Sequence, residues 1–170
     1  MRTAFAVLLV AAAAPAHAML ATPASVEDLA RSSQAVVRGR VASVTSRWSD
    51  DQRRIFTYVE LQPSSVWRGA AGARVTVLVP GGVVGPIGQR VEGAPAFAKG
   101  EDVVAFLSEA EAGTFRVTGL AQGKFTVDGA QARPDLSRVT FVPSAAMAAG
   151  ERRVEAMDVA ELERRVRSVQ

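Results

Sequence analysis

Cysteine is absent from this 170-residue chain, and His17 is the only histidine. Without Cys there is no disulfide framework and no thiolate nucleophile. Without a His after residue 17, the rest of the chain has no base for a Ser-His-Asp or Cys-His arrangement. Structural zinc and His-rich catalytic metal sites lack their ligands for the same reason. These absences exclude the commonest hydrolytic and zinc chemistries, and we expect no metal site and no cofactor.

Lysines are also scarce, and like charges do not cluster along the chain. Lys99 and Lys124 are the only lysines, and neither follows a Ser by three residues, so there is no S-x-x-K nucleophile motif. The 20 basic and 17 acidic side chains are scattered, with a net charge of +3. Because no block of five or six like charges occurs, a mixed solvated surface is favoured over a nucleic-acid groove. We predict no nucleic-acid partner.

Long hydrophobic runs are missing except at the start of the chain. Arg2, an apolar run from Ala4 to Ala14 and the small-x-small pattern Ala16-His17-Ala18 are typical of a secretory signal peptide. The alternative, a membrane anchor, needs roughly 20 apolar residues. We therefore expect residues 1–18 to be removed by a cut after Ala18, a secreted or periplasmic protein, and no later transmembrane segment.

The remaining residues suit one domain with a single N-terminal helix and many short strands. In residues 19–33, Ser25 caps a short helix with acidic residues in its first turn. Strand patterns follow at 34–48, where Gly39 marks a bend, and at 54–61, with which the first should form a hairpin. Pro63 interrupts the pattern, and Val66-Trp67 resumes it. Further strands are expected at 74–79, 103–107, 115–117, 125–127 and 139–142.

The chain ends in an amphipathic helix after an Ala-rich linker, within residues 143–170. Asp158 and Glu161 form a capping-box pattern, and Val159, Leu162, Val166 and Val169 lie on one stripe. Pairs from Glu161 to Arg165 and from Glu163 to Arg167 have the i,i+4 spacing that supports a helix. We expect this helix to pack on the sheet, with a partner-binding helix as the alternative.

Residues 80–98 are predicted to form a long loop whose conformation is set by Gly and Pro. They are rich in Gly and Pro and contain one strand-like piece, Gln89-Arg90-Val91. A loop of this length in a small domain is usually functional or mobile. A backbone anion nest built on Gly81 and Gly82 is the alternative to tight loop geometry, but neither a following helix nor a Lys supports it.

Together these patterns predict a mainly β fold, a small OB-like antiparallel β-barrel over residues 34–142 with a short N-terminal helix and a C-terminal helix. A two-sheet sandwich is the alternative. The segments AVVRGRVASV, RIFTYVELQPSSVWRG, RVTVLVPGG and FAKGEDVVAFL resemble the netrin-like domains, which include the tissue inhibitors of metalloproteinases. The resemblance runs from Gln34 to about Leu107 and implies an OB-fold. The wider pattern also resembles uncharacterised exported bacterial proteins.

The metalloproteinase inhibitors of the netrin-like family bind the protease zinc through an N-terminal Cys and carry disulfides. This chain has no Cys, and its predicted first mature residue is Met19. The zinc-binding group therefore cannot be transferred to any position. An inhibitory mode that uses other loops stays open.

The sequence contains few candidate binding residues. Trp48, Tyr58 and Trp67 lie on or beside the first two strands, on a face that often binds sugars or oligonucleotides in OB-folds. Trp67 is the strongest core candidate, and Trp48 is expected to be the most exposed of the three. The predicted binding residues are Trp48, Tyr58, Gly81, Gly82, Val84, Ile87 and Arg90.

Carboxylates are present but carry no mark of a catalytic site. Asp50 and Asp51 could contribute to an all-oxygen calcium site, although a DD pair in a hairpin turn is more often solvated turn chemistry. Glu60, Glu92, Glu101 and Asp102 could serve glycoside hydrolysis, which needs two acids across a cleft. We assign no catalytic residue.

The sequence thus predicts an exported non-enzymatic binding module, with a protease or another extracellular or envelope protein as its partner. The alternatives are a carbohydrate-binding or carboxylate-dependent glycan-acting domain, and a structural envelope protein without a ligand.

Overall fold

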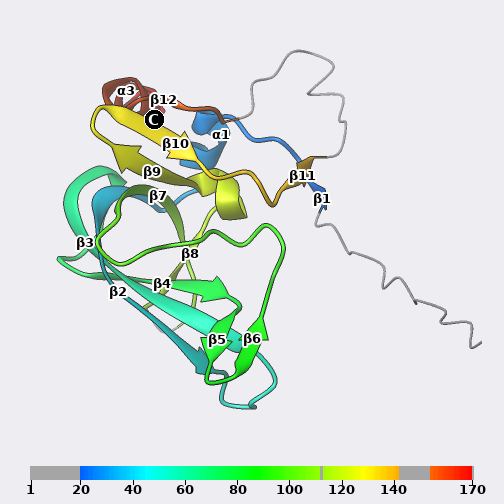
Figure 1. The fold of residues 1–170 in the computed structure, drawn as a ribbon. Coiled ribbons are helices and arrows are strands. Elements are labelled where there is room, and N and C mark those ends of the chain that lie inside the picture. The colour runs from blue at the N-terminus through cyan, green and yellow to red at the C-terminus, as the bar shows by residue number, and fades with distance from the viewer. Residues whose placement is uncertain (1–19, 112, 142–153, 170) are drawn as a thin grey trace, which may run out of the picture.

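Five strands close into a barrel in the computed structural model, which describes residues 20–111, 113–141 and 154–169 (Figure 1). They are β2 (Ala35–Trp48), β3 (Ile55–Gly69), β4 (Val75–Pro80), β7 (Asp102–Glu109) and β8 (Phe115–Val117). The strands pair in the order β7-β2-β3-β4-β8, and β8 pairs back with β7. All neighbours are antiparallel except β4 and β8, which are parallel. The predicted OB-like barrel is confirmed, and the sandwich alternative is wrong.

The other elements extend or cover the barrel. The same sheet continues from β7 through β9 (Lys124–Asp128), β10 (Gln131–Pro134) and β12 (Met157–Asp158). Helices α1 (Val26–Arg31) and α3 (Val159–Arg167) lie together beside this extension (Figure 1). The remaining elements are the parallel pair β1 (Leu20–Ala21) and β11 (Thr140–Phe141), the hairpin β5 (Gly82–Val84) and β6 (Ile87–Gln89), and the 3-10 helix η1 (Leu120–Gly123). In the described residues, no helix has the length and apolar character needed to cross a membrane.

The barrel interior is filled by small and medium apolar side chains from alternate positions. Val75, Val77 and Val79 of β4 are buried while their neighbours are partly exposed, as the period of two predicts. Val59 and Leu61 of β3 join them, and Phe97 from the segment after β6 packs against the same cluster. These side chains form the first of two cores.

The second core lies between the outer face of the sheet and the two helices. Phe106 and Phe125 meet here with ring centroids 5.9 Å apart, and Trp67 is buried beside them. Leu162 and Val166 of α3 complete the layer, so the C-terminal helix packs on the sheet as predicted. Strand β7 serves both cores, because Val103, Ala105 and Leu107 face the barrel and Val104 and Phe106 face the helices.

Gly39 and Pro63 explain how two long strands bend around the barrel. The two residues are opposite each other at a register shift between β2 and β3. A Cβ on Gly39 would overlap the Gln62 carbonyl oxygen, so only glycine allows the close approach. Pro63 lies beyond Leu61, where β4 stops pairing with β3, and its missing N–H therefore costs no ladder bond there. Strand β3 thus continues through Pro63, where the sequence pattern suggested an interruption.

Several local expectations are corrected. Arg165 does not pair with Glu161; it reaches across to Glu27 of α1, with two contacts of 2.7 Å. Glu161 pairs with Arg164, and the predicted Glu163–Arg167 pair is present at 2.7 Å. The strand expected at 139–142 is the short β11, paired with β1. The predicted signal peptide, the predicted Ala-rich linker and Val142 lie outside the described residues.

Candidate functional site

A groove of about 610 Å³ opens where β2, β3 and β4 run past the end of the barrel core. Its floor contains Val44 and Ser46 of β2, Thr57 and Val59 of β3, and Val79 of β4. The hairpin β5–β6 forms one wall, and the segment 94–97 forms another. Val83 and Gly88 from the hairpin face this space, and Val83 is two-thirds exposed. The groove is therefore an open, largely apolar hollow at one end of the barrel.

Residues 82–89 form a β-hairpin, where the sequence predicts a long loop with one strand-like piece at 89–91. Gly82 lies with φ 142° against β2 and β3, where a Cβ would overlap Ser46 Oγ and Thr57 Oγ1. Thr57 donates to the Gly81 carbonyl at 2.7 Å, and the Ile55 N–H donates to Gln89 Oε1 at 2.6 Å. These contacts fix the hairpin on the floor of the groove.

The segment after β6 is held by backbone pairing and by a buried ion pair. The Val41 N–H donates to the Glu101 carbonyl and the Gly100 N–H to the Val41 carbonyl, each at 2.8 Å. Lys124 is nearly fully buried, contacts Glu101, and lies 5.3 Å from the centroid of the Phe97 ring. The groove wall at 94–97 is therefore anchored to the barrel and to β9.

Glu101 is ionised at neutral pH despite its burial. Loss of solvent by itself raises the pKa of this carboxyl group, but hydrogen bonds from Lys124, Thr126 and the Ala98 amide outweigh that effect and leave the pKa below its ordinary value. The Ala98 N–H donates to Glu101 Oε2 at 3.0 Å. Because its acceptor sites are occupied in this way, Glu101 acts as a structural anchor.

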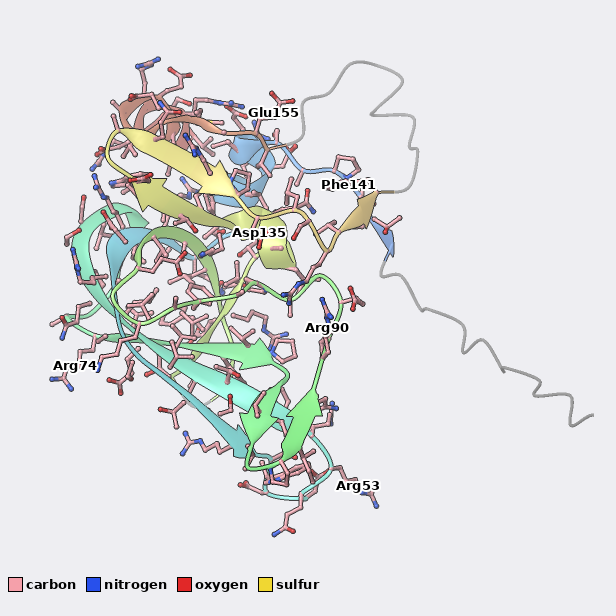
Figure 2. The ribbon with its side chains drawn as sticks, viewed as in Figure 1. Arg53, Arg74, Arg90, Asp135, Phe141 and Glu155 are labelled. Carbon is pink, nitrogen blue, oxygen red and sulfur yellow. The ribbon has the colours of Figure 1, made fainter. Side chains whose placement is uncertain are left out.

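Two arginines give the groove its charge. Arg90 follows β6, and Arg138 comes from the segment between β10 and β11. Figure 2 shows Arg90 on the segment that leaves the hairpin after β6 toward the rest of the molecule. Its guanidinium lies 3.4 Å from Glu92, and both side chains are exposed. No Asp or Glu is among the described residues that line the groove.

The structure brings some of the predicted binding residues together and separates others. Gly81, Gly82 and Arg90 line the groove. Val84 and Ile87 pair with each other near the hairpin turn, with Ile87 half exposed, and neither lines the groove. The glycines act through tight geometry, since Gly81, Gly82 and Gly85 all have positive φ.

The two aromatic candidates on β2 and β3 lie outside the groove lining. Trp48 is half-buried and opposite Ile55 in the β2–β3 ladder. Tyr58 is on the other face of the ribbon from Thr57, and the Arg47 guanidinium covers its ring at 3.6 Å. Trp48 and Tyr58 therefore do not form one stacking platform.

Most of the groove residues were not predicted as binding residues from the sequence, among them Val44, Ser46, Thr57 and Arg138. Val44 and Ser46 share a parity with Trp48 on β2, so the alternation of the strand was the one available signal. Arg138 lies far along the chain in a segment with no strong pattern. Only the tertiary fold places it in the same groove lining as Arg90.

The Asp50–Asp51 pair forms part of the β2–β3 turn. Asp51 accepts from the Ser49 hydroxyl at 2.5 Å and from the Arg53 N–H at 3.1 Å, and mainly the Ser49 bond lowers its pKa. Within residues 20–111, 113–141 and 154–169, no three acidic side chains gather as a cation site requires.

No protein-family model matches this sequence, and no curated protein matches it. Function is therefore inferred from the groove, its charge and its place on the barrel.

Proposed function

We propose that this chain is an exported, non-enzymatic binding protein whose groove holds a segment of another protein. The observation that carries the proposal is the open apolar groove at the end of an OB-like barrel, with exposed Val83 on its wall and two arginines in its lining. Apolar surface of this kind beside a few polar groups is typical of an interaction site.

The side chains in the groove support binding over catalysis. The described lining residues offer hydroxyl, amide and guanidinium groups, which can hold a ligand through hydrogen bonds, and none of these residues carries a carboxylate, imidazole or thiol to act as a general base. The netrin-like resemblance adds a class of partner, a secreted protease. Since the zinc-binding Cys of that family is missing, inhibition would depend on the hairpin and the adjoining segment 90–97.

Affinity capture from the envelope and culture medium of the source organism tests this proposal. The full chain is compared with a variant in which residues Val83–Ile87 are replaced by a Gly/Ser linker. We expect a protein that is retained by the natural chain, is lost with the variant, and binds directly after purification; a captured protease is then assayed for inhibition. Two results together would contradict the proposal and favour the carbohydrate-binding alternative: captured proteins that bind the natural chain and the variant equally well, and binding of the natural chain to a glycan panel.

A further inference from the structure

The groove presents an excess of hydrogen-bond donors and positive charge. Arg90 and Arg138 both line it, and its described lining contains no carboxylate. Among the described acidic residues, Asp135 is near enough to Arg138 for that charge, after the hydrogen bonds from Ser137, to help lower the pKa of Asp135. Glu92 meets Arg90 at 3.4 Å through a single pair of atoms, with the Arg90 side chain 65% and the Glu92 side chain 41% exposed. Such an exposed pair contributes little and is easily exchanged for another carboxylate. The lining is therefore complementary to an anionic ligand.

Gln89 adds a neutral donor. Because the Ile55 N–H can only donate, the side-chain oxygen of Gln89 must face it, as the 2.6 Å contact shows. The NH2 group of Gln89 consequently lies on the other side of the amide, and it can donate to a ligand because it makes no hydrogen bond within the described part of the chain. Ser46 supplies the complementary acceptor. Thr57 uses its single hydroxyl hydrogen on the Gly81 carbonyl, so Ser46 donates to Thr57 at 2.9 Å and keeps its own lone pairs.

An open strand edge lies beside these groups. Strand β2 pairs with β7 from Ala35 to Arg40 and with β3 along its whole length. From Ser43 to Trp48, no strand in the described part of the chain pairs with the edge of β2 that faces away from β3. Val44 and Ser46 from this stretch line the groove. An exposed edge next to side-chain pockets is the arrangement that binds an extended peptide by strand addition.

We infer that the groove binds an extended peptide segment carrying a carboxylate, with Arg90 and Arg138 holding the carboxylate and the apolar floor holding adjacent aliphatic side chains. This inference rests on the proposed function and specifies its ligand. A peptide fits better than an alkyl chain, because Ser46, Gln89 and the β2 edge offer alternating donors and acceptors that an alkyl chain cannot use. Guanidinium groups bind carboxylates through charge-assisted hydrogen bonds.

Selection from a displayed library of random octapeptides with free C-termini tests the inference on the full chain. The variant with Val83–Ile87 replaced serves as the parallel bait. Peptides enriched only on the natural chain are then synthesised with either a free or an amidated C-terminus, and with each Asp or Glu changed to Asn or Gln. Their dissociation constants are measured by fluorescence anisotropy at low and high salt.

We expect the enriched peptides to combine aliphatic residues with an essential carboxylate, and amidation or the amide substitution to weaken binding by about tenfold, the loss typical of one charge-assisted bond. The double variant Arg90→Gln/Arg138→Gln should lose the preference for the carboxylate and the salt dependence, while still binding the aliphatic part weakly. Arg74→Gln is the control, since Arg74 is exposed on another side of the barrel (Figure 2). Glu92→Gln should strengthen binding, because it removes the competing carboxylate from Arg90.

The possible results separate the two proposals. Peptides that depend on the hairpin but bind equally well without a carboxylate would overturn the inference and leave the binding function standing. A carboxylate preference that survives in the double arginine variant would also overturn it. If the selection yields no peptide that binds the natural chain better than the hairpin variant, that result would count against the peptide-binding groove itself, and with it against the proposed function.

Discussion

Gly82 is the residue at which one methyl group should most disturb the groove. A Cβ there would overlap the hydroxyls of Ser46 and Thr57, and its φ of 142° disfavours any L side chain. We expect Gly82→Ala to lower the free energy of unfolding by about 1–3 kcal/mol and to shift the hairpin off the floor. Gly85→Ala is the control, because Gly85 also has positive φ but has nothing within 4 Å of the added Cβ. If urea unfolding gives the same loss of stability for Gly82→Ala and Gly85→Ala, the close approach of Gly82 to Ser46 and Thr57 is unimportant.

Phe106 tests the second core at the same scale. Its side chain is fully buried and contacts Phe125 between the sheet and the helices. Phe106→Ala should cost about 3–5 kcal/mol. The matched control, Phe56→Ala, removes a partly exposed ring and should cost clearly less. A neutral Phe106→Ala in chemical unfolding would contradict the central place of β7.

Among the elements, the segment after β6 depends on the Lys124–Glu101 pair. Lys124→Met leaves a buried carboxylate without its cation, and we expect a loss of about 3 kcal/mol at neutral pH. The double variant Lys124→Met/Glu101→Gln should lose less of the free energy of unfolding than Lys124→Met, since no buried charge remains at this site. Urea unfolding of the three proteins measures both effects.

The same pair predicts a pH dependence with a definite sign. In the natural chain the pKa of Glu101 is below its ordinary value of 4.5, so its contribution to stability is complete above that pH and is lost as the pH falls through the folded-state pKa. In Lys124→Met the pKa of Glu101 should instead be raised, and protonation should then stabilise the fold. The stability gap between the two proteins should narrow from pH 7 to pH 4. A stability difference between the two proteins that does not change from pH 7 to pH 4 would contradict this prediction.

The two helices are joined by Glu27 and Arg165, which form two contacts of 2.7 Å and are about three-quarters buried. Hydrogen bonds with Arg165 mainly lower the pKa of Glu27. Arg165→Met should cost about 1 kcal/mol. Arg164→Met is the comparison, because Arg164 is 71% exposed and its ion pair in the described part of the chain is with Glu161 of the same helix, so its effect on the thermal midpoint should be smaller.

At the scale of the whole molecule, the barrel and the helix layer should unfold together while the hairpin tip is dispensable. Strand β7 contributes side chains to both cores, whereas Val83 and Ile87 project from the hairpin and are exposed. Replacing Val83–Ile87 with a Gly/Ser linker should therefore keep a single unfolding transition near the original midpoint. The same replacement at residues 70–73, the β3–β4 turn, is the control for loop entropy. A large loss specific to 83–87 would mean that the hairpin supports the fold.

Much of the fold followed from local pattern. The Ser25 cap predicted α1, and the strand patterns at 74–79 and 103–107 predicted β4 and β7. The hairpin at 82–89 was missed because its pairing depends on contacts with Ser46, Thr57 and Ile55 that are distant in the sequence. Arg165 was assigned to Glu161 because spacing along a helix is visible in a sequence and a second helix is not.

The sequence by itself determined the mainly β class, the two helices, and the absence of Cys and of a His after residue 17, because composition and the periods of two and 3.6 are local properties. Only the tertiary structure decided where the groove lies and what charge it carries. Arg90 and Arg138 are far apart in the chain, and Ser46, Thr57 and Gly82 come from three strands. Their meeting follows from strand register and barrel closure, which depend on long-range packing that no local pattern encodes.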